Sequence, residues 1–460
     1  MSILSALFDD SKTYNFTQAF GAKDITSEEM RAAIRMWLAL YFDRPESDTE
    51  DDCQRLPALI VSKLTRTVFS EYEAKLDGTG GKADFLRRQL TRLDAVRGEA
   101  MQQMLVGGEC FLKPVLVRDG FVFAVVRRDR FIPLARDLTG AIISVGTAEQ
   151  TVQDGRYYTL LERRTAGVDG LTIESKLFVS DGRTTLGTQT ALSVLDKYAA
   201  LQPSVTLPIA GLGMVSLRTP MLNCVDGSAD GVAVYAPAVG LIRNINRNER
   251  LLCDEFERGQ SRIIASGDLL QTDQYGKRKL DAKVFTALDD DPDTVGISIF
   301  SPALREASYL ARKQEYLRNI ESQIGLKRGI LSAVEAAERT ATEITSTAGD
   351  YNLTIIDFQR VWEQAAREAL ALCDTLGQLY KRCDSSRFDP DALVIDWGDG
   401  VLFDRTRTWQ EYTQMVGAGL LKPELALAWY FDLPHSTPEE LAKIRTDYMP
   451  ELEQLTNGGD

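Results

Sequence analysis

Apolar residues recur at alternating spacings of four and three positions in the segment after residue 340. The spacing predicts one amphipathic helix over residues 354–381, about 40 Å long, with a single apolar stripe and Cys373 at its edge. A capping-box pattern at Thr340 and Glu343 would start this helix, whereas Gly349 is expected to bend or interrupt it. A helix this long is expected to span a domain and not to fill its core. The stripe consists of Phe358, Trp362, Ala365, Ala369, Leu372, Leu376 and Leu379.

Two further helical patterns enclose a short insert ahead of that segment. Pro237 suits a first helical position, and the apolar face that follows it runs to Gly259. Ser301 and Pro302 supply a cap and a first-turn residue for the second helix. We therefore predict a helix on each side of a β-containing insert. The face of the first helix comprises Ala238, Ile242, Ile245, Leu252 and Phe256; the insert is Gln260–Phe300, with strand candidates Arg262–Ala265, Val284–Leu288 and Ile297–Phe300.

A charged segment with little apolar periodicity separates the second of these helices from the long one. It covers Leu326–Arg339 and carries a second capping-box pattern at Ser332 and Glu335. We predict a loop here. The two helices and the loop are expected to line a feature that the rest of the chain holds in place.

The remainder of the chain alternates helical patterns with hairpin signals. Capping boxes at Thr26/Glu29 and Thr437/Glu440 mark two helix starts, and the Asp-Gly pair at 119–120 is a strong hairpin signal. Together these elements predict an α+β fold. Further helices are expected at Leu56–Phe69, Ala83–Leu105, Arg405–Val416, Pro423–Phe431 and Pro438–Tyr448, and strands at Cys110–Val117, Phe121–Val126, Tyr157–Arg163, Leu171–Val179 and Leu393–Asp396.

Composition and charge narrow the class of protein. The 460 residues suggest two or three structural units, and a hydrophobic content of 44% is enough for a sizeable core. No run approaches the roughly 18 apolar residues of a membrane span, and the first residues lack a signal-peptide pattern, so we expect synthesis in the cytosol and no membrane contact. The net charge of −14 argues against a protein that neutralises many phosphates, although it allows nucleic acid to slide past.

Residues able to support nucleophilic catalysis are sparse. Any Ser/His or Cys/His system would have to use His435, the single histidine, which we interpret as a surface or core residue. No GxxxxGK[ST] phosphate loop occurs, so the sequence does not encode an ATPase motor of that type. The cysteines lack a CxxC pair and are predicted to be reduced, buried thiols. They are Cys53, Cys110, Cys224, Cys253, Cys373 and Cys383.

Two acidic clusters could in principle hold cations. They are Asp289, Asp290, Asp291 and Asp293, and Asp396, Asp399 and Asp404. The first fails as an EF-hand, because Thr294 stands where glycine belongs and Phe300 where the bidentate glutamate belongs. The second could hold the two metals of a nuclease, but no histidine or lysine accompanies it at a suggestive spacing. We interpret both as turn or cap residues and predict no metal, no cofactor and no enzymatic activity.

Several runs of residues, in a specific order and spacing, give the chain its family resemblance. They are LPALIVSKLTRTVF, GGECFLKPVLV, DRFIPLARDLTG, YYTLLE, LDDDPD, GLKRGILS followed by ERTATEITS, DWGDGVLFDRTRTWQEY, and GLLKPELALAWYFDLPHSTPEEL. The chain resembles the portal (head–tail connector) proteins of tailed bacteriophages, in the branch found in siphophages and prophages of Gram-positive hosts.

The resemblance implies a ring, usually of twelve subunits, at one capsid vertex, with double-stranded DNA entering and leaving through its channel. It implies a virion protein that assembles in the cytoplasm of the bacterial host. The implied organisation is an N-terminal wing (1–236), first stem helix (237–259), clip (260–303), second stem helix (304–325), tunnel loop (326–339), long helix (340–383) and C-terminal wing with a small crown (384–460). The apolar stripes would then be buried against neighbouring subunits, since a ring closes by head-to-tail contacts.

The resemblance also implies partners and candidate sites. Terminase would dock on the clip during DNA packaging, tail-completion proteins would replace it, and capsid and scaffolding proteins would surround the ring. The tunnel-loop candidates for transient DNA contact are Lys327, Arg328, Glu335, Glu338 and Arg339, and the clip docking candidates are Asp289, Asp290, Asp291 and Asp293. Salt bridges between subunits are an equal alternative for any one of the loop charges.

Two hypotheses from other classes stay open at this point. One is a phage-encoded, metal-dependent hydrolase or nuclease that uses Asp396, Asp399 and Asp404. The other is a different minor structural protein of the phage head.

Overall fold

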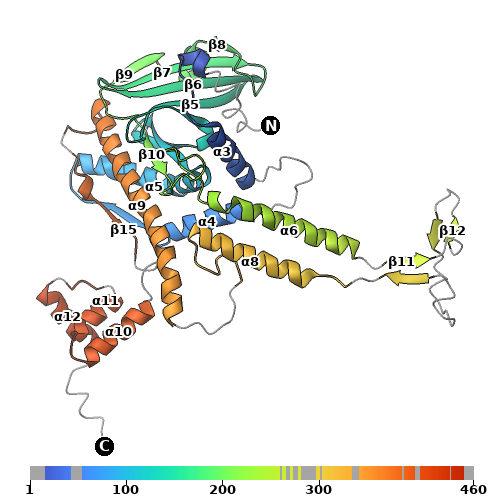
Figure 1. Ribbon diagram of the computed structural model, residues 1–460. Helices are drawn as coiled ribbons and strands as arrows, with labels where there is room; N and C mark the ends of the chain where they lie inside the picture. Colours follow the sequence, from blue (N-terminus) through green and yellow to red (C-terminus); the bar gives the residue numbers. More distant parts are fainter. Residues whose placement is uncertain are drawn as a thin grey trace, which may run out of the picture.

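The structure, a computed structural model, has a body of helices and antiparallel sheets from which two helices project to one side (Figure 1). It is 49% helical and 22% strand, and every described strand pair is antiparallel, so the predicted α+β class is confirmed. The described residues are 16–42, 54–259, 262–265, 270–272, 278–280, 297–300, 303–333, 341–385, 388–398, 405–431, 433–435 and 437–449.

Four helices build the body around one large apolar core. They are α3 (Glu28–Tyr41), α4 (Leu56–Val68), α5 (Gly81–Gly107) and α9 (Ala341–Leu379). In Figure 1, α9 runs along the whole body and ends near the largest sheet. It packs against α4, α5 and one strand, so segments that are hundreds of residues apart in the sequence share the core.

Three sheets complete the body. The largest has the order β4-β5-β6-β7-β8, with β9 pairing to β7, and a second has the order β10-β2-β3. A two-stranded sheet, β1 with β15, joins the N-terminal region to the segment after α9. The strands are β1 (Glu73–Leu76), β2 (Glu109–Val117), β3 (Gly120–Val126), β4 (Phe131–Arg136), β5 (Ile142–Gln153), β6 (Arg156–Gly167), β7 (Gly170–Ser180), β8 (Thr188–Thr190), β9 (Ser204–Leu207), β10 (Val215–Arg218) and β15 (Leu393–Asp396).

The two projecting helices, α6 (Val239–Arg258) and α8 (Glu306–Ile324), lie side by side and are called the arm below (Figure 1). The short strands at their far end pair as β11 (Arg262–Ala265) with β14 (Ile297–Phe300), and as β12 (Leu270–Thr272) with β13 (Arg278–Leu280). The predicted helices on both sides of a β-containing insert are therefore present. The strand candidate Val284–Leu288 lies outside the described residues. The second helix begins at Glu306, and residues 303–305 before it are not helical. The predicted start at Ser301 and Pro302 is therefore wrong.

The C-terminal part forms three short helices, as predicted: α10 (Arg405–Gly417), α11 (Pro423–Phe431) and α12 (Pro438–Tyr448). The capping box of α12 is confirmed, because the Thr437 hydroxyl accepts from the Glu440 N–H and the Glu440 carboxylate accepts from the Thr437 N–H. Arg445 of α12 pairs with the buried Glu424 of α11, which ties these two helices together.

The long helix differs from the prediction in two respects. It is continuous from Ala341 to Leu379, so Gly349 does not interrupt it. Its stripe also fills the core of its own chain: Trp362 is 0% exposed, and its ring contacts that of Phe69 with centroids 5.5 Å apart. The expectations that this helix would not fill a core, and that its stripe would need neighbouring subunits for burial, are therefore wrong. Only its last member, Leu379, is exposed.

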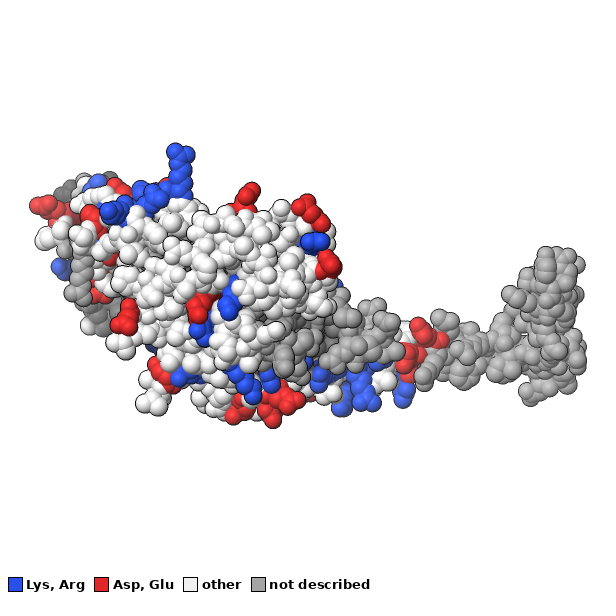
Figure 2. Space-filling model, turned by 90° about the horizontal axis from the view of Figure 1, so that it is seen from above, with Lys and Arg blue, Asp and Glu red and all other residues white. Residues whose placement is uncertain are grey.

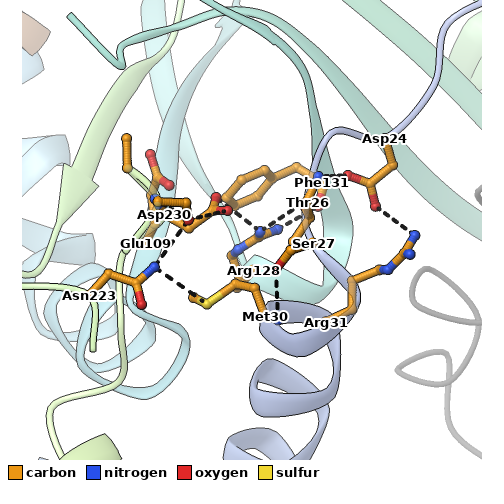
Figure 3. Close-up of polar contacts among 12 residues, drawn as sticks. Asp24, Thr26, Ser27, Met30, Arg31, Glu109, Arg128, Phe131, Asn223 and Asp230 are labelled. Atoms are coloured by element: carbon orange, nitrogen blue, oxygen red, sulfur yellow. Dashed lines mark hydrogen bonds and ion pairs between the residues drawn. The ribbon is translucent and has the colours of Figure 1, made fainter. Parts of the chain in front are cut away.

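The residue that caps α3 is Ser27 and not the predicted Thr26, because the side chain of Thr26 is bonded to the buried guanidinium of Arg128. Ser27 caps the helix by accepting from the Met30 N–H at 3.0 Å. Thr26 is instead buried, where its hydroxyl accepts from the guanidinium of Arg128 at 3.4 Å (Figure 3). The guanidinium also donates to the Phe131 carbonyl and faces Asp230, so it links α3 to the strands behind it.

The cysteine prediction is partly wrong. Cys110 and Cys373 are buried, and burial raises the pKa of both thiols. Cys224, in a loop, and Cys253, on the arm, are exposed, because the apolar residues beside them in the sequence do not all face a core. Cys383 is half-buried, and Cys53 lies outside the described residues.

Candidate channel and docking elements

The arm is anchored in the body at its base. Ile242 and Ile245 of α6 and Ile320 of α8 belong to the same buried cluster as the α9 stripe. Polar contacts then join the two helices: the Asn248 amide donates to the Tyr309 carbonyl at 3.1 Å, and the Lys313 ammonium lies 2.8 Å from a Glu249 carboxylate oxygen. The arm is thus a firm extension of the body core near its base.

The apolar face of the arm continues beyond the part that the chain itself covers. On α6, Ile242, Ile245 and Leu252 are buried, but Phe256 is 44% exposed. On α8, Leu310 is 50% exposed. Phe256 and Leu310 thus mark the outer part of this face that the chain leaves uncovered.

Charge is distributed unevenly along the arm. Figure 2 shows blue side chains gathered along it and a broad, mostly uncharged face over the body. Arg243 and Arg247 of α6 are exposed, four positions apart, and therefore lie on one side of the helix. Farther out, Arg305 forms a two-bond ion pair with Glu255, at 2.6 and 3.0 Å. Arg243 and Arg247 thus lie nearer the body than this ion pair.

The segment that follows α8 is held by one buried carboxylate. Glu321 is 0% exposed. Its Oε1 accepts from the backbone N–H groups of Gly329, Leu331 and Ser332 at 3.1, 2.6 and 2.9 Å. Its Oε2 accepts from the Ser332 hydroxyl at 2.8 Å. The backbone N–H of Leu326 donates to the Glu321 carbonyl at 2.8 Å, so the first residues after the helix turn back onto its last turn.

This carboxylate was not among the predicted site residues, although the sequence contains a signal for it. The apolar residues Leu317, Ile320 and Ile324 recur at helical spacing, and Glu321 shares their face. A charge on an apolar face is buried only when it is well bonded. The pattern could therefore have marked Glu321, but not its partners.

The predicted loop residues divide into two groups. Lys327 and Arg328 are exposed, and neither forms an ion pair with the residues that the structure describes. Glu335, Glu338 and Arg339 lie outside the described residues, as do the predicted docking residues Asp289, Asp290, Asp291 and Asp293. Ser332 is described, and its hydroxyl is used by Glu321.

A cavity of about 580 Å³ lies between α9, β2, β10 and the β4–β5 turn. Its polar end contains Glu109, and burial raises the pKa of this carboxyl. The Glu109 Oε1 accepts a hydrogen bond from the Ser216 hydroxyl at 2.9 Å. Arg136, also in the lining, is held by Asp230 at 2.7 Å. The lining contains no histidine or lysine that could activate Ser216. The cavity thus contains one hydroxyl–carboxylate contact, between Ser216 and Glu109.

The residues of the nuclease hypothesis are only partly described. Asp396 is exposed on β15 and accepts from the Gly398 N–H at 2.9 Å, whereas Asp399 and Asp404 lie outside the described residues. Within the described part of the chain, no group of three or more His, Cys, Asp or Glu residues could hold a metal ion.

His435 is exposed, with Nδ1 3.0 Å from the Leu433 carbonyl. None of the described helices is long and apolar enough to cross a membrane.

No family model and no curated protein matches the chain. Among solved structures, a chain from "Neck of native GTA particle computed with C12 symmetry" is similar with a TM-score of 0.44 and 12% identity, over 92% of this chain and 99% of that one. A chain from "Neck of empty GTA particle computed with C6 symmetry" gives 0.43 and 11%, over 91% and 98%. Likenesses this low carry no argument for function, which has to rest on the chain's own residues.

Proposed function

We propose that the chain is a phage portal protein, a non-enzymatic subunit of a ring at one capsid vertex. The ring would be the conduit for double-stranded DNA packaging and ejection. The observation that carries the proposal is the order of elements along the chain: a two-helix arm with strands at its far end, then the segment held by Glu321, then α9. This is the order that the sequence resemblance implies for stem, clip, tunnel loop and long helix.

The arm gives the proposal a physical basis for self-assembly. Phe256 and Leu310 are half exposed in the single chain. A neighbouring copy in a closed ring would cover them, because head-to-tail contacts repeat the same pair of surfaces around the ring. The proposed ring has twelve subunits, and its interface includes the outer half of the arm.

The charges on the arm and the loop fit a channel that must release DNA. Each neutralised phosphate adds affinity and would slow sliding. The exposed cations Arg243, Arg247, Lys327 and Arg328 belong to a chain whose net charge is −14. Terminase and head–tail connector proteins would dock at the strands of the far end, and capsid and scaffolding proteins would surround the ring in the virion.

Native mass spectrometry and negative-stain images of the purified chain test the proposal. The expected result is a closed ring, with a mass near twelve times 51.1 kDa and a central hole. A chain that stays monomeric at high concentration, and also with scaffolding protein present, would contradict it. Magnesium- or manganese-dependent DNA cleavage that is lost in Asp396→Asn would instead support the nuclease hypothesis.

A further inference from the structure

The contacts of Glu321 are concentrated on one short stretch of backbone. All four hydrogen bonds of its side chain go to residues 329–332, and its own carbonyl holds Leu326. The side chain is fully buried, so these bonds are shielded from the bulk solvent. A buried carboxylate without partners is strongly unfavourable, and this one is satisfied only while the segment stays in place.

Two glycines allow the backbone to converge on this carboxylate. Gly325 ends α8 with φ of 74°, a left-handed conformation that reverses the chain direction. Gly329 has φ of 93°, which brings its own N–H and those of Leu331 and Ser332 to the same side. The sequence GLKRGILS thus supplies a turn at each end of the Lys-Arg pair.

Lys327 and Arg328 occupy the outer side of the resulting loop. Leu326 before them is buried, and the Ile330 N–H after them donates to the Lys327 carbonyl at 3.3 Å. The two basic side chains are exposed between these fixed points. Because their flanking residues are held, the direction in which they project depends on the Glu321 contacts.

We infer that Glu321 is a positioning residue: its carboxylate holds residues 329–332 and so keeps the loop as a rigid bracket that presents Lys327 and Arg328 to passing DNA. The bracket itself follows from the contacts above, whereas its effect on DNA rests on the proposed portal function. DNA phosphates moving past would meet two cations at a constant place, and not two mobile side chains on a loose loop.

Hydrogen exchange of the full chain, measured by mass spectrometry on peptides that cover residues 326–333, tests the bracket. We expect Glu321→Ala to speed exchange in these peptides about tenfold or more, since each bond to a charged acceptor contributes a factor of that order. Glu321→Gln, which keeps one acceptor oxygen and the side-chain volume, should give a smaller increase and serves if the alanine variant fails to fold. Glu315→Ala, an exposed glutamate on the same helix, is the control and should leave these peptides unchanged. Unchanged exchange in folded Glu321 variants would overturn the inference.

The fraction of particles filled with DNA tests the effect on passage. We expect Glu321→Gln and the double variant Lys327→Gln/Arg328→Gln to change this fraction in the same direction and by similar factors, and the triple variant to change it no further than the double, because Glu321 acts through the two cations. A further change in the triple variant, or normal filling in the double, would overturn the positioning role. Failure of the unchanged chain to form rings would instead overturn the proposed function and leave the exchange result standing.

Discussion

The body and the arm use the same kind of apolar helix face in opposite ways. In the body, the α9 stripe is covered by α4, α5 and the strands of the same chain, so that Phe358 and Trp362 are fully buried. In the arm, the face of α6 is covered near the base and left open at Phe256. In the single chain the body thus covers its own apolar stripe, whereas the outer arm leaves Phe256 and Leu310 exposed.

The largest expected effect is on the body. Trp362→Asp would place a charge in a fully buried site beside Phe69, and we expect it to destabilise the chain by more than about 4 kcal/mol, enough to prevent folding or assembly. Leu353→Asp is the matched control, because Leu353 lies on the same helix and is exposed; its effect should stay within about 0.5 kcal/mol. Thermal and urea unfolding measure both. An unchanged melting temperature in Trp362→Asp would show that the stripe is not a core.

The next effect concerns a buried charge in the large sheet. Burial by itself would raise the pKa of Glu162, but Arg164 at 2.6 Å and Lys113 at 2.8 Å outweigh it and lower the pKa to about 2. Because the folded pKa lies below the usual 4.5, the stabilisation is present above pH 4.5 and is lost as the pH falls toward 2. We expect Glu162→Gln to cost about 3 kcal/mol at pH 7.

Urea unfolding from pH 7 down to pH 2 measures this difference. The difference in the free energy of unfolding between Glu162→Gln and the unchanged chain should become smaller as the pH falls. Glu149→Gln, which removes an exposed pair with Lys197, should cost no more than about 1 kcal/mol at any pH. A gap that stays constant with pH would show that Glu162 acts by shape and not by charge.

A smaller effect is expected on the arm. Leu310→Ser should change the stability of the single chain by less than about 0.5 kcal/mol, because the side chain is already half exposed. If a neighbouring copy covers it, the loss of about 1 kcal/mol of burial should weaken association about fivefold. Analytical ultracentrifugation measures the association. Leu138→Ser, in an exposed turn of the body, is the control, and equal association in both variants would place the interface elsewhere.

The smallest effect on stability is expected from the loop. Shortening the chain between residues 333 and 339, beyond the residues that bond Glu321, should leave unfolding and ring assembly unchanged, yet lower the DNA content of particles. Negative-stain images and nucleic-acid quantification measure the two properties. Normal DNA content in particles with the shortened loop would contradict the assignment of this segment to the channel.

Local pattern predicted most elements of the fold. The spacing of apolar residues and the turn and helix-capping signals located the arm helices, the β2–β3 hairpin, the β6–β7 pair and the capping box at Thr437. Strands β4 and β5 were missed, because Pro133 and Gly146 break their pattern and tertiary contacts bury the polar residues Ser144 and Thr147 of β5. The α3 cap was misplaced by one residue, because Arg128, about a hundred positions away, donates a hydrogen bond to the Thr26 hydroxyl.

The sequence by itself determined which faces are apolar, which segments form most of the helices, and that the loop after α8 carries a Lys-Arg pair between glycines. These properties depend on residues a few positions apart. Only the tertiary structure decided what covers each face, because burial depends on which distant segments meet it. It buried the α9 stripe within the chain, left Phe256 open, and brought four donors to the buried carboxylate of Glu321.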